Sequence, residues 1–177
     1  MPPAPVLQTA RLRGCPPQAS DVDDLTGFYA DPAHFDSLGG RSPEAGEAAM
    51  RATIFVAEAA QFWAGRGYGP FLLRTKTRFV GLCGFRPPPD ETPADVAWPF
   101  LIFGVERELR RRGYASEAAR AAMVWMQTAH RFTRIDAATR EDNAAAQSVL
   151  RKLGFAGPTP TTLYGAELSL FRWSHGA

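Results

Sequence analysis

The segment that decides how the chain is interpreted runs Phe103-Gly104-Val105-Glu106-Arg107-Glu108-Leu109-Arg110-Arg111-Arg112-Gly113-Tyr114-Ala115-Ser116-Glu117-Ala118. An apolar strand leads into a turn rich in arginine and glycine, and that turn opens a helix. The first N–H groups of a helix lack partners within it and carry partial positive charge, so such an end favours anions, above all phosphate. Gly113 and the small Ala115 would let a ligand approach the backbone closely. Guanidinium groups bind phosphate oxygens in pairs, so the arginines strengthen the prediction of a phosphate-binding turn.

A solvated basic turn with an ordinary loop glycine explains the same residues, because short glycine motifs often arise by chance. The spacing alone leaves both interpretations open. The turn contains no GKS or GKT string and no GxGxxG pattern. A nucleoside triphosphate or a dinucleotide is therefore not the preferred ligand.

The flanking patterns predict an α/β domain with a mixed sheet. The expected order is a strand, two helices, three antiparallel strands, a helix, a strand, a helix and a final strand region. The expected strands are Val6–Arg13, Phe71–Arg74, Phe79–Phe85, Trp98–Val105, Thr133–Thr139 and one or two within Leu163–Trp173; the expected helices are Asp21–Tyr29, Ser42–Trp63, Ser116–His130 and one that begins at Asp142 or Asn143 and ends at Gly154.

Composition limits the class of protein. The chain has 177 residues, 45% of them hydrophobic and 21% charged, with a formal net charge of +2. These values are typical of one globular domain, so we expect residues 1–177 to form a single domain with a loose proline-rich start over residues 1–6. The small charge argues against a nucleic-acid partner. No apolar run reaches the ~20 residues of a membrane helix, and no signal peptide is evident, so we expect a cytoplasmic protein without a membrane partner.

Cysteine and histidine give no metal signal. Cys15 and Cys83 form no CxxC pair, and the three histidines form no HExxH pattern. We therefore expect two separate reduced thiols and no metal site.

Four strings of this sequence resemble the GNAT superfamily of N-acetyltransferases, in its RimJ/RimL-like branch that acetylates ribosomal-protein N-termini. Arg110-x-x-Gly113-x-Ala115 resembles that family's acyl-CoA pyrophosphate loop. Residues 113–118 resemble the branch's GYATEA string, and residues 7–12 resemble its LxTxRL opening strand. Residues 141–146 followed by residues 152–155 resemble its ENxAS…KLGF string. The resemblance extends from about residue 7 to residue 173, in the family's order.

The resemblance implies a GNAT-like fold. Its mixed, mostly antiparallel central sheet has six to seven strands and about four flanking helices. The sheet would be splayed between the fourth strand, Phe100–Val105, and the fifth, Thr133–Thr139. Acetyl-CoA would lie in the splay as the co-substrate.

The resemblance also implies a set of cofactor-binding residues. Pantetheine would pair with the strand that ends at Val105, with Gly104 at a bulge whose N–H could hold the thioester carbonyl. The pyrophosphate would sit on the N–H groups of residues 111–116. The full set is Phe103, Gly104, Val105, Arg110, Arg111, Arg112, Gly113, Tyr114, Ala115, Ser116, Asn143 and Lys152.

Several of these residues also have a purely structural explanation. Gly104 would equally allow close packing beneath a neighbouring helix. Asn143 would equally be a simple helix cap. Lys152 would equally be an inert surface charge. Glu117, in the first helical turn, is expected only to complement the helix dipole.

The sequence departs from the family at the acid and base positions. Phe100 stands where the branch often has a glutamate, Ala146 where relatives place a serine, and Leu150 where others have a tyrosine. Asp95 is the nearest carboxylate to the strand that begins at Phe100, so we name it as a candidate catalytic residue. Asn143 is the second candidate, because the resemblance places it near the thiol end of the cofactor. Tyr114, Tyr164 and Ser148 are further candidates for proton donor to the thiolate that the sequence does not place.

The resulting functional hypothesis is transfer of an acetyl group from acetyl-CoA to a primary amine by direct transfer in a ternary complex. The acceptor would be a protein N-terminal α-amine or a small-molecule amine, and Phe28, Phe35, Trp63 and Trp98 are candidate walls of its site, or else ordinary core aromatics. Homodimers are common in the family, and a homodimer is expected on that ground alone. The competing hypotheses are a non-catalytic acyl-CoA-binding module and a nucleotide-binding protein of another kind.

Overall fold

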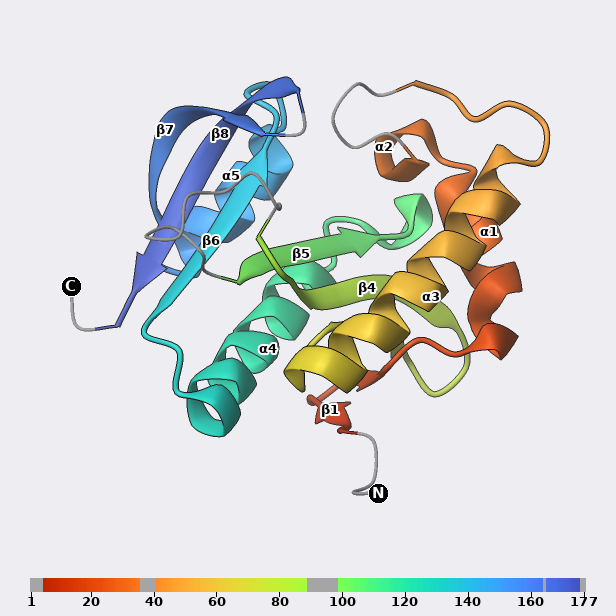
Figure 1. The fold of residues 1–177 in the computed structure, drawn as a ribbon, viewed down its shortest axis with the longest axis horizontal. Coiled ribbons are helices and arrows are strands. Elements are labelled where there is room, and N and C mark those ends of the chain that lie inside the picture. Colours follow the sequence, from red (N-terminus) through yellow and green to blue (C-terminus); the bar gives the residue numbers. More distant parts are fainter. Residues whose placement is uncertain (1–4, 36–40, 89–98, 164, 176–177) are drawn as a thin grey trace.

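The computed structural model describes residues 5–35, 41–88, 99–163 and 165–175. Its eight strands form one sheet in the order β1-β2-β3-β4-β5-β6-β8-β7 (Figure 1). The strands are β1 (Leu7–Gln8), β2 (Arg13–Cys15), β3 (Pro70–Arg74), β4 (Phe79–Arg86), β5 (Phe100–Val105), β6 (Arg134–Thr139), β7 (Ala156–Leu163) and β8 (Ala166–Ser174). The α-helices are α1 (Val22–Tyr29), α2 (Pro32–Phe35), α3 (Glu47–Arg66), α4 (Tyr114–His130) and α5 (Ala144–Lys152).

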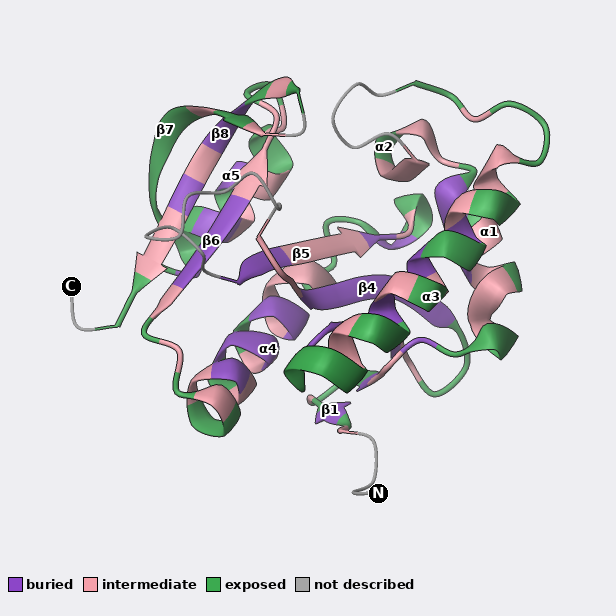
Figure 2. Ribbon diagram, in the orientation of Figure 1, coloured by how far each residue is buried: buried purple, intermediate pink, exposed green. Residues whose placement is uncertain are grey.

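Side-chain alternation along the central strands builds a core on each face of the sheet. In β3, Phe71 and Leu73 belong to the cluster that packs against α4, whereas Leu72 belongs to the cluster that packs against α1 and α3. Successive residues of a strand point to opposite faces, so both helical layers are needed to bury this strand. Figure 2 shows the consequence, with β4 buried along most of its length between the layers. None of the described helices is long and apolar enough to cross a membrane.

The sheet is splayed between β5 and β6. These strands are parallel, and they pair at a single position, Phe100 opposite Asp136. There the Asp136 N–H donates to the Pro99 carbonyl at 3.1 Å. Beyond that position β6 leaves β5 and continues its antiparallel pairing with β8 (Figure 1). The carboxyl-terminal half of β5 therefore has no strand on that side within the described chain.

The structure corrects the expected number of elements. The expected first strand is two short strands, β1 and β2, because the Thr9 N–H donates to the Leu12 carbonyl and closes a turn between them. The expectation also omitted β7, which contains two prolines; proline is tolerated there because β7 is an edge strand. The sheet thus has eight strands instead of six to seven, and the splay falls between the fifth and sixth.

The helices differ from expectation mainly at the N-terminal side. Pro32 opens the short helix α2 instead of only ending α1. The long helix begins at Glu47, after a left-handed Gly46, and not at Ser42-Pro43. Five α-helices are therefore described where about four were expected.

An ion-pair cluster lies where β5 and β6 meet. The Asp136 side chain is buried, with 1% of the residue exposed. Its two oxygens accept hydrogen bonds from Arg134 and from Arg172, between 2.9 and 3.3 Å. A buried carboxylate is tolerated only when it is paired in this way. The cluster therefore ties β6 and β8 together at the point where the sheet begins to open.

We predict that Asp136→Ala lowers the free energy of unfolding by about 3 kcal/mol, because it takes the buried carboxylate from two half-buried guanidinium groups. The matched control is Asp142→Ala, which removes an equally well formed pair with Arg140 whose carboxylate side chain is 71% exposed. That control should cost no more than about 1 kcal/mol. Urea unfolding of both variants measures the difference, and equal losses would contradict the assignment.

Candidate functional site

The loop between β5 and α4 presents backbone N–H groups to solvent. After the 3₁₀ turn η3 (Arg107–Leu109), Arg111 and Gly113 both adopt left-handed conformations, with φ of 62° and 81°. Gly113 is the N-cap of α4 and offers no capping side chain. The first helical hydrogen bond runs from the Glu117 N–H to the Gly113 carbonyl at 3.0 Å. The N–H groups of residues 114–116 precede that bond, and a turn of this kind concentrates donors for an anion.

The second part of the site is the open edge of β5. The Glu106 N–H donates to the Val80 carbonyl at 2.9 Å, on the β4 side. Because backbone groups alternate along a strand, the N–H and C=O of Val105 and of Phe103 point to the splayed side. These groups are able to pair with an extended ligand as a further strand would.

The Val105 carbonyl is held by two side chains. It accepts a hydrogen bond from Arg110 Nε at 3.2 Å and lies 3.0 Å from His34 Nε2. Arg110 also donates to Asp31 at 2.7 Å, and its NH2 nitrogen lies 3.0 Å from His34 Nε2. The predicted phosphate ligand Arg110 is thus turned toward α1 and α2. Arg111 and Arg112 are exposed beside the helix opening.

Gly104 is required for close packing, and the expected bulge is absent. The β4–β5 register is continuous from Gly81 opposite Val105 to Arg86 opposite Phe100. A Cβ on Gly104 would lie 2.8 Å from Phe28 Cζ and 3.2 Å from the His34 ring. The His34 ring is stacked on Phe28, with 3.8 Å between the ring centroids. The absence of a side chain at Gly104 therefore allows the His34 imidazole to pack directly against β5.

Burial and charge fix the ionisation of this cluster. Burial, assisted by the Arg110 charge, lowers the pKa of His34 to about 4, so the imidazole is neutral at neutral pH. Burial alone would raise the pKa of Asp31, but the Ala33 N–H and the Arg110 guanidinium bring it below its ordinary value. A cavity of about 340 Å³ opens beside the cluster and is lined by His34, Asp31 and Glu106 among others.

The second helix opening lies at the same edge of the sheet. β5 and β6 are parallel, so the chain leaves both strands at one edge, toward α4 and toward α5. Asn143 caps α5: its Oδ1 accepts the Ala146 N–H at 3.1 Å. Lys152 is exposed at the opposite end of α5, so the structure does not bring it together with Asn143.

The candidates for proton transfer are only partly placed. Asp95 and Tyr164 lie outside the described residues. Phe100 and Leu150 are buried, Leu150 within the α4-side core, and Ser148 is exposed on α5. Tyr114 packs against the α4-side core beneath the Arg11 guanidinium, which lies 4.5 Å from its ring centroid.

The expected aromatic walls do not form one group. Phe28 and Phe35 belong to the cluster beneath α1 and α3. Trp63 instead packs against Phe71 and Trp125 in the α4-side cluster. Trp98 lies outside the described residues. In the part of the chain that the structure describes, no group of three or more His, Cys, Asp or Glu side chains could hold a metal ion.

Two side chains of this region, His34 and Arg11, were not predicted from the sequence. His34 is separated from Arg110 by 76 residues and Arg11 from Glu117 by 106. The LxTxRL string includes Arg11, but no local pattern indicates what its side chain binds. Glu117 does more than complement the helix dipole, because Thr9 and Arg11 both bind its carboxylate.

The family described as Acetyltransferase (GNAT) domain matches residues 11–156. The chain belongs to this family. Solved structures superpose on most of the chain. A ribosomal-protein-S5-alanine acetyltransferase from Vibrio fischeri superposes with a TM-score of 0.76 at 14% identity, covering 97% of each chain. RimJ of Mycobacterium smegmatis, solved with CoA-disulfide, superposes at 0.72 with 20% identity, covering 92% of this chain and 81% of RimJ. At these identities the likeness is one of fold.

A curated relative matches in sequence over a shorter region. YjdG, an uncharacterized N-acetyltransferase of Bacillus subtilis (strain 168), is 32% identical over 92 residues. These residues are 51% of this chain and 52% of YjdG, so the match spans about half the length of that relative.

We predict that His34 makes folding stability depend on pH. The folded-state pKa of about 4 is below the ordinary value of 6.5, so the unfolded chain binds the proton more readily. This stabilisation is present above pH 6.5 and is lost as the pH falls toward 4. Between pH 7.5 and pH 5, the wild type should lose about 2 kcal/mol more unfolding free energy than His34→Gln. Parallel curves for the two proteins over that range would contradict a buried neutral imidazole.

Proposed function

We propose that this protein is an acetyl-CoA-dependent N-acetyltransferase that moves an acetyl group to a primary amine in a ternary complex. The observation that carries the proposal is the splay: β5 and β6 pair at one position and then part, and both strands lead to helix openings at the same edge. An extended ligand with an anionic end matches that arrangement, because the β5 edge offers strand-like pairing and the α4 opening offers N–H donors.

The diphosphate would bind the N–H groups of Arg111 to Ser116, with Arg111 and Arg112 adding charge. The left-handed φ of Arg111 supports this assignment, because a non-glycine residue is retained in that strained conformation where it turns N–H groups toward a ligand. Gly113 adopts a left-handed φ without strain. Pantetheine would pair with Phe103 and Val105. The Val105 carbonyl would then be released by His34 and Arg110, and the freed guanidinium would be available for phosphate.

The transfer itself needs deprotonation of the amine, stabilisation of the tetrahedral oxyanion and departure of the thiolate. Holding the amine beside the thioester supplies much of the acceleration. A backbone N–H of β5 would stabilise the oxyanion. Asn143 and Asp95 remain the proposed catalytic side chains, with Lys152 near the adenosine phosphate. Phe100, Ala146 and Leu150 cannot transfer protons, although they occupy the usual acid and base positions. Water and backbone groups would therefore accept the proton of the amine and supply the proton of the thiolate.

The acceptor we propose is a protein N-terminal α-amine or a small-molecule amine, as the RimJ/RimL-like strings imply. The Vibrio fischeri relative is named for the alanine of ribosomal protein S5. We propose on the same resemblance that the protein acts in the cytoplasm and forms a homodimer, without a nucleic-acid, membrane or metal partner.

A second candidate function is a non-catalytic acyl-CoA-binding module. It is favoured by the apolar residues at the usual acid and base positions, since Phe100 and Leu150 are 6% and 1% exposed. A panel of amine acceptors separates the two functions. Binding of acetyl-CoA without turnover of any amine would favour the module.

We predict that acetyl-CoA raises the melting temperature of the wild type and that Gly113→Glu abolishes the rise. The glutamate would adopt an unfavourable φ of 81° and place a negative charge in the donor turn. ATP, which lacks pantetheine, should give no comparable rise. Differential scanning fluorimetry at increasing ligand concentration measures the effect.

Gly46→Glu is the matched control for this experiment. Gly46 is also a left-handed helix N-cap, with φ of 84°, and it opens α3 instead of α4. It should suffer the same backbone strain and keep the full response to acetyl-CoA. No response of the wild type at saturating acetyl-CoA would refute the proposed function, and a full response of Gly113→Glu would refute the assigned loop.

A further inference from the structure

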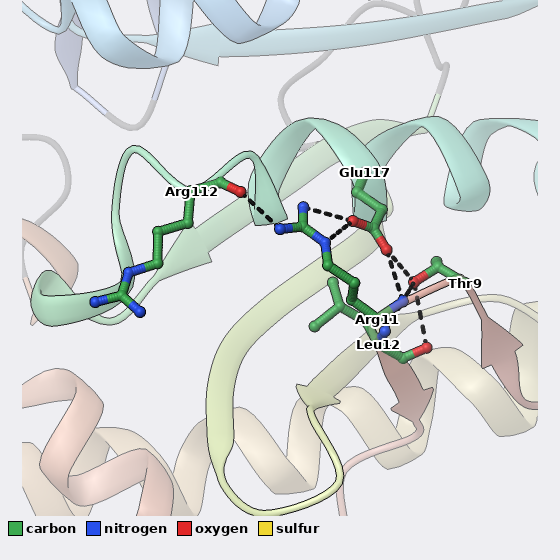
Figure 3. Close-up of polar contacts among 5 residues, drawn as sticks. All are labelled: Thr9, Arg11, Leu12, Arg112 and Glu117. Atoms are coloured by element: carbon green, nitrogen blue, oxygen red, sulfur yellow. Dashed lines mark hydrogen bonds and ion pairs between the residues drawn. The ribbon is translucent and has the colours of Figure 1, made fainter.

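The Glu117 carboxylate is held from both sides by the turn between β1 and β2 (Figure 3). Its Oε1 accepts the Thr9 hydroxyl at 2.6 Å and the Arg11 N–H at 3.0 Å. Its Oε2 accepts Arg11 Nε at 2.6 Å, and Arg11 NH2 is equally close. The Thr9 hydroxyl oxygen also accepts the Leu12 N–H at 2.9 Å, so the turn itself is fixed in the same network.

The same guanidinium reaches the phosphate-binding turn. Arg11 NH1 donates to the Arg112 carbonyl at 2.9 Å, and the guanidinium lies over the Tyr114 ring. Figure 3 shows the Arg112 guanidinium directed away from this network, so Arg112 is held there by its backbone. One side chain from the beginning of the chain therefore contacts the turn, the first helical residue and the first-turn carboxylate of α4.

This network compensates the negative charge of Glu117 at the N-terminus of α4. A carboxylate in the first turn of a helix is stabilised by the N–H groups there, and it competes with any phosphate for the same positive field. Glu117 is 20% exposed, and hydrogen bonds from Thr9 and Arg11 hold its pKa below its ordinary value although burial opposes that. The carboxylate is thus charged, and its charge is compensated by Arg11. Both of its oxygens accept hydrogen bonds from the turn between β1 and β2.

We propose that Thr9 and Arg11 are positioning residues for the diphosphate of acetyl-CoA. They hold Glu117 and the Arg112 carbonyl in place. The N–H groups of Arg111 to Ser116 thereby stay available to the diphosphate, and the negative charge of Glu117 stays compensated by Arg11. The inference rests on the proposed function. It assigns a shared role to two sequence strings that lie more than one hundred residues apart, LxTxRL and GYASEA.

The test compares two acyl donors that differ in the diphosphate. Arg11→Ala should weaken acetyl-CoA binding, measured as Kd by calorimetry, about tenfold, because charge-assisted bonds to the carboxylate and the turn are lost. With S-acetylpantetheine, which lacks the diphosphate, kcat/KM should stay within about twofold of the wild type. A merely structural role would reduce activity with both donors alike.

Removal of the Glu117 charge and conservative replacement of Thr9 test the same role independently. Arg11→Ala combined with Glu117→Gln should recover part of the lost affinity, because no uncompensated carboxylate then faces the phosphate. Thr9→Val should weaken binding by less than Arg11→Ala, and Thr9→Ser should restore it. If Arg11→Ala fails to fold, the Thr9 pair and Glu117→Gln carry the same comparison.

Arg41→Ala is the matched control, because Arg41 makes a two-contact pair with Glu47 of similar exposure at the start of α3. It should leave the acetyl-CoA Kd unchanged. An unchanged Kd in Arg11→Ala would overturn the positioning role while acetyl-CoA binding by the wild type still stands. Absence of acetyl-CoA binding in the wild type would overturn the proposed function and this inference with it.

Discussion

The structure depends on the single position at which two parallel strands meet, Phe100 opposite Asp136. A sheet that closed further would satisfy the β5 edge internally and leave nothing for a ligand to pair with. A sheet that did not close at all would expose the apolar residues on both faces. One pairing joins the halves of the sheet and leaves the carboxyl-terminal half of β5 open. Beside it, the buried Asp136 and its two arginines fix β6 to β8.

Two polar networks flank the donor turn that follows β5. On one side Arg11 pairs with Glu117 and supports the turn through the Arg112 carbonyl. On the other side His34 and Arg110 hold the Val105 carbonyl at the open edge. The first network is positioned to remain in place when a ligand binds, because it uses none of the free N–H groups. The second occupies a group that the ligand needs, so binding would exchange its contacts.

Local signals predicted the parts of the site that depend on local structure. The apolar run that ends at Val105 forms the expected strand, and Asn143 forms the expected helix cap. The turn after Val105 opens a helix as expected, but the helix begins at Tyr114, two residues before the predicted Ser116, with Gly113 as its N-cap. The bulge at Gly104 was wrong, because the demand for glycine comes from the His34 ring packed on it from another helix. Contacts of this kind depend on tertiary packing, and the spacing of residues along the chain does not encode them.

Two-dimensional ¹H–¹⁵N NMR, which follows the backbone amide resonances while CoA is added, reports where CoA binds. We predict the largest shifts at Arg111 to Ser116 and at the open-edge residues Phe103 and Val105, with smaller changes at His34. Shifts confined to the cavity around Glu106, or spread over β7 and β8 with the turn unaffected, would contradict the assignment of the splayed strands as the acyl-CoA site.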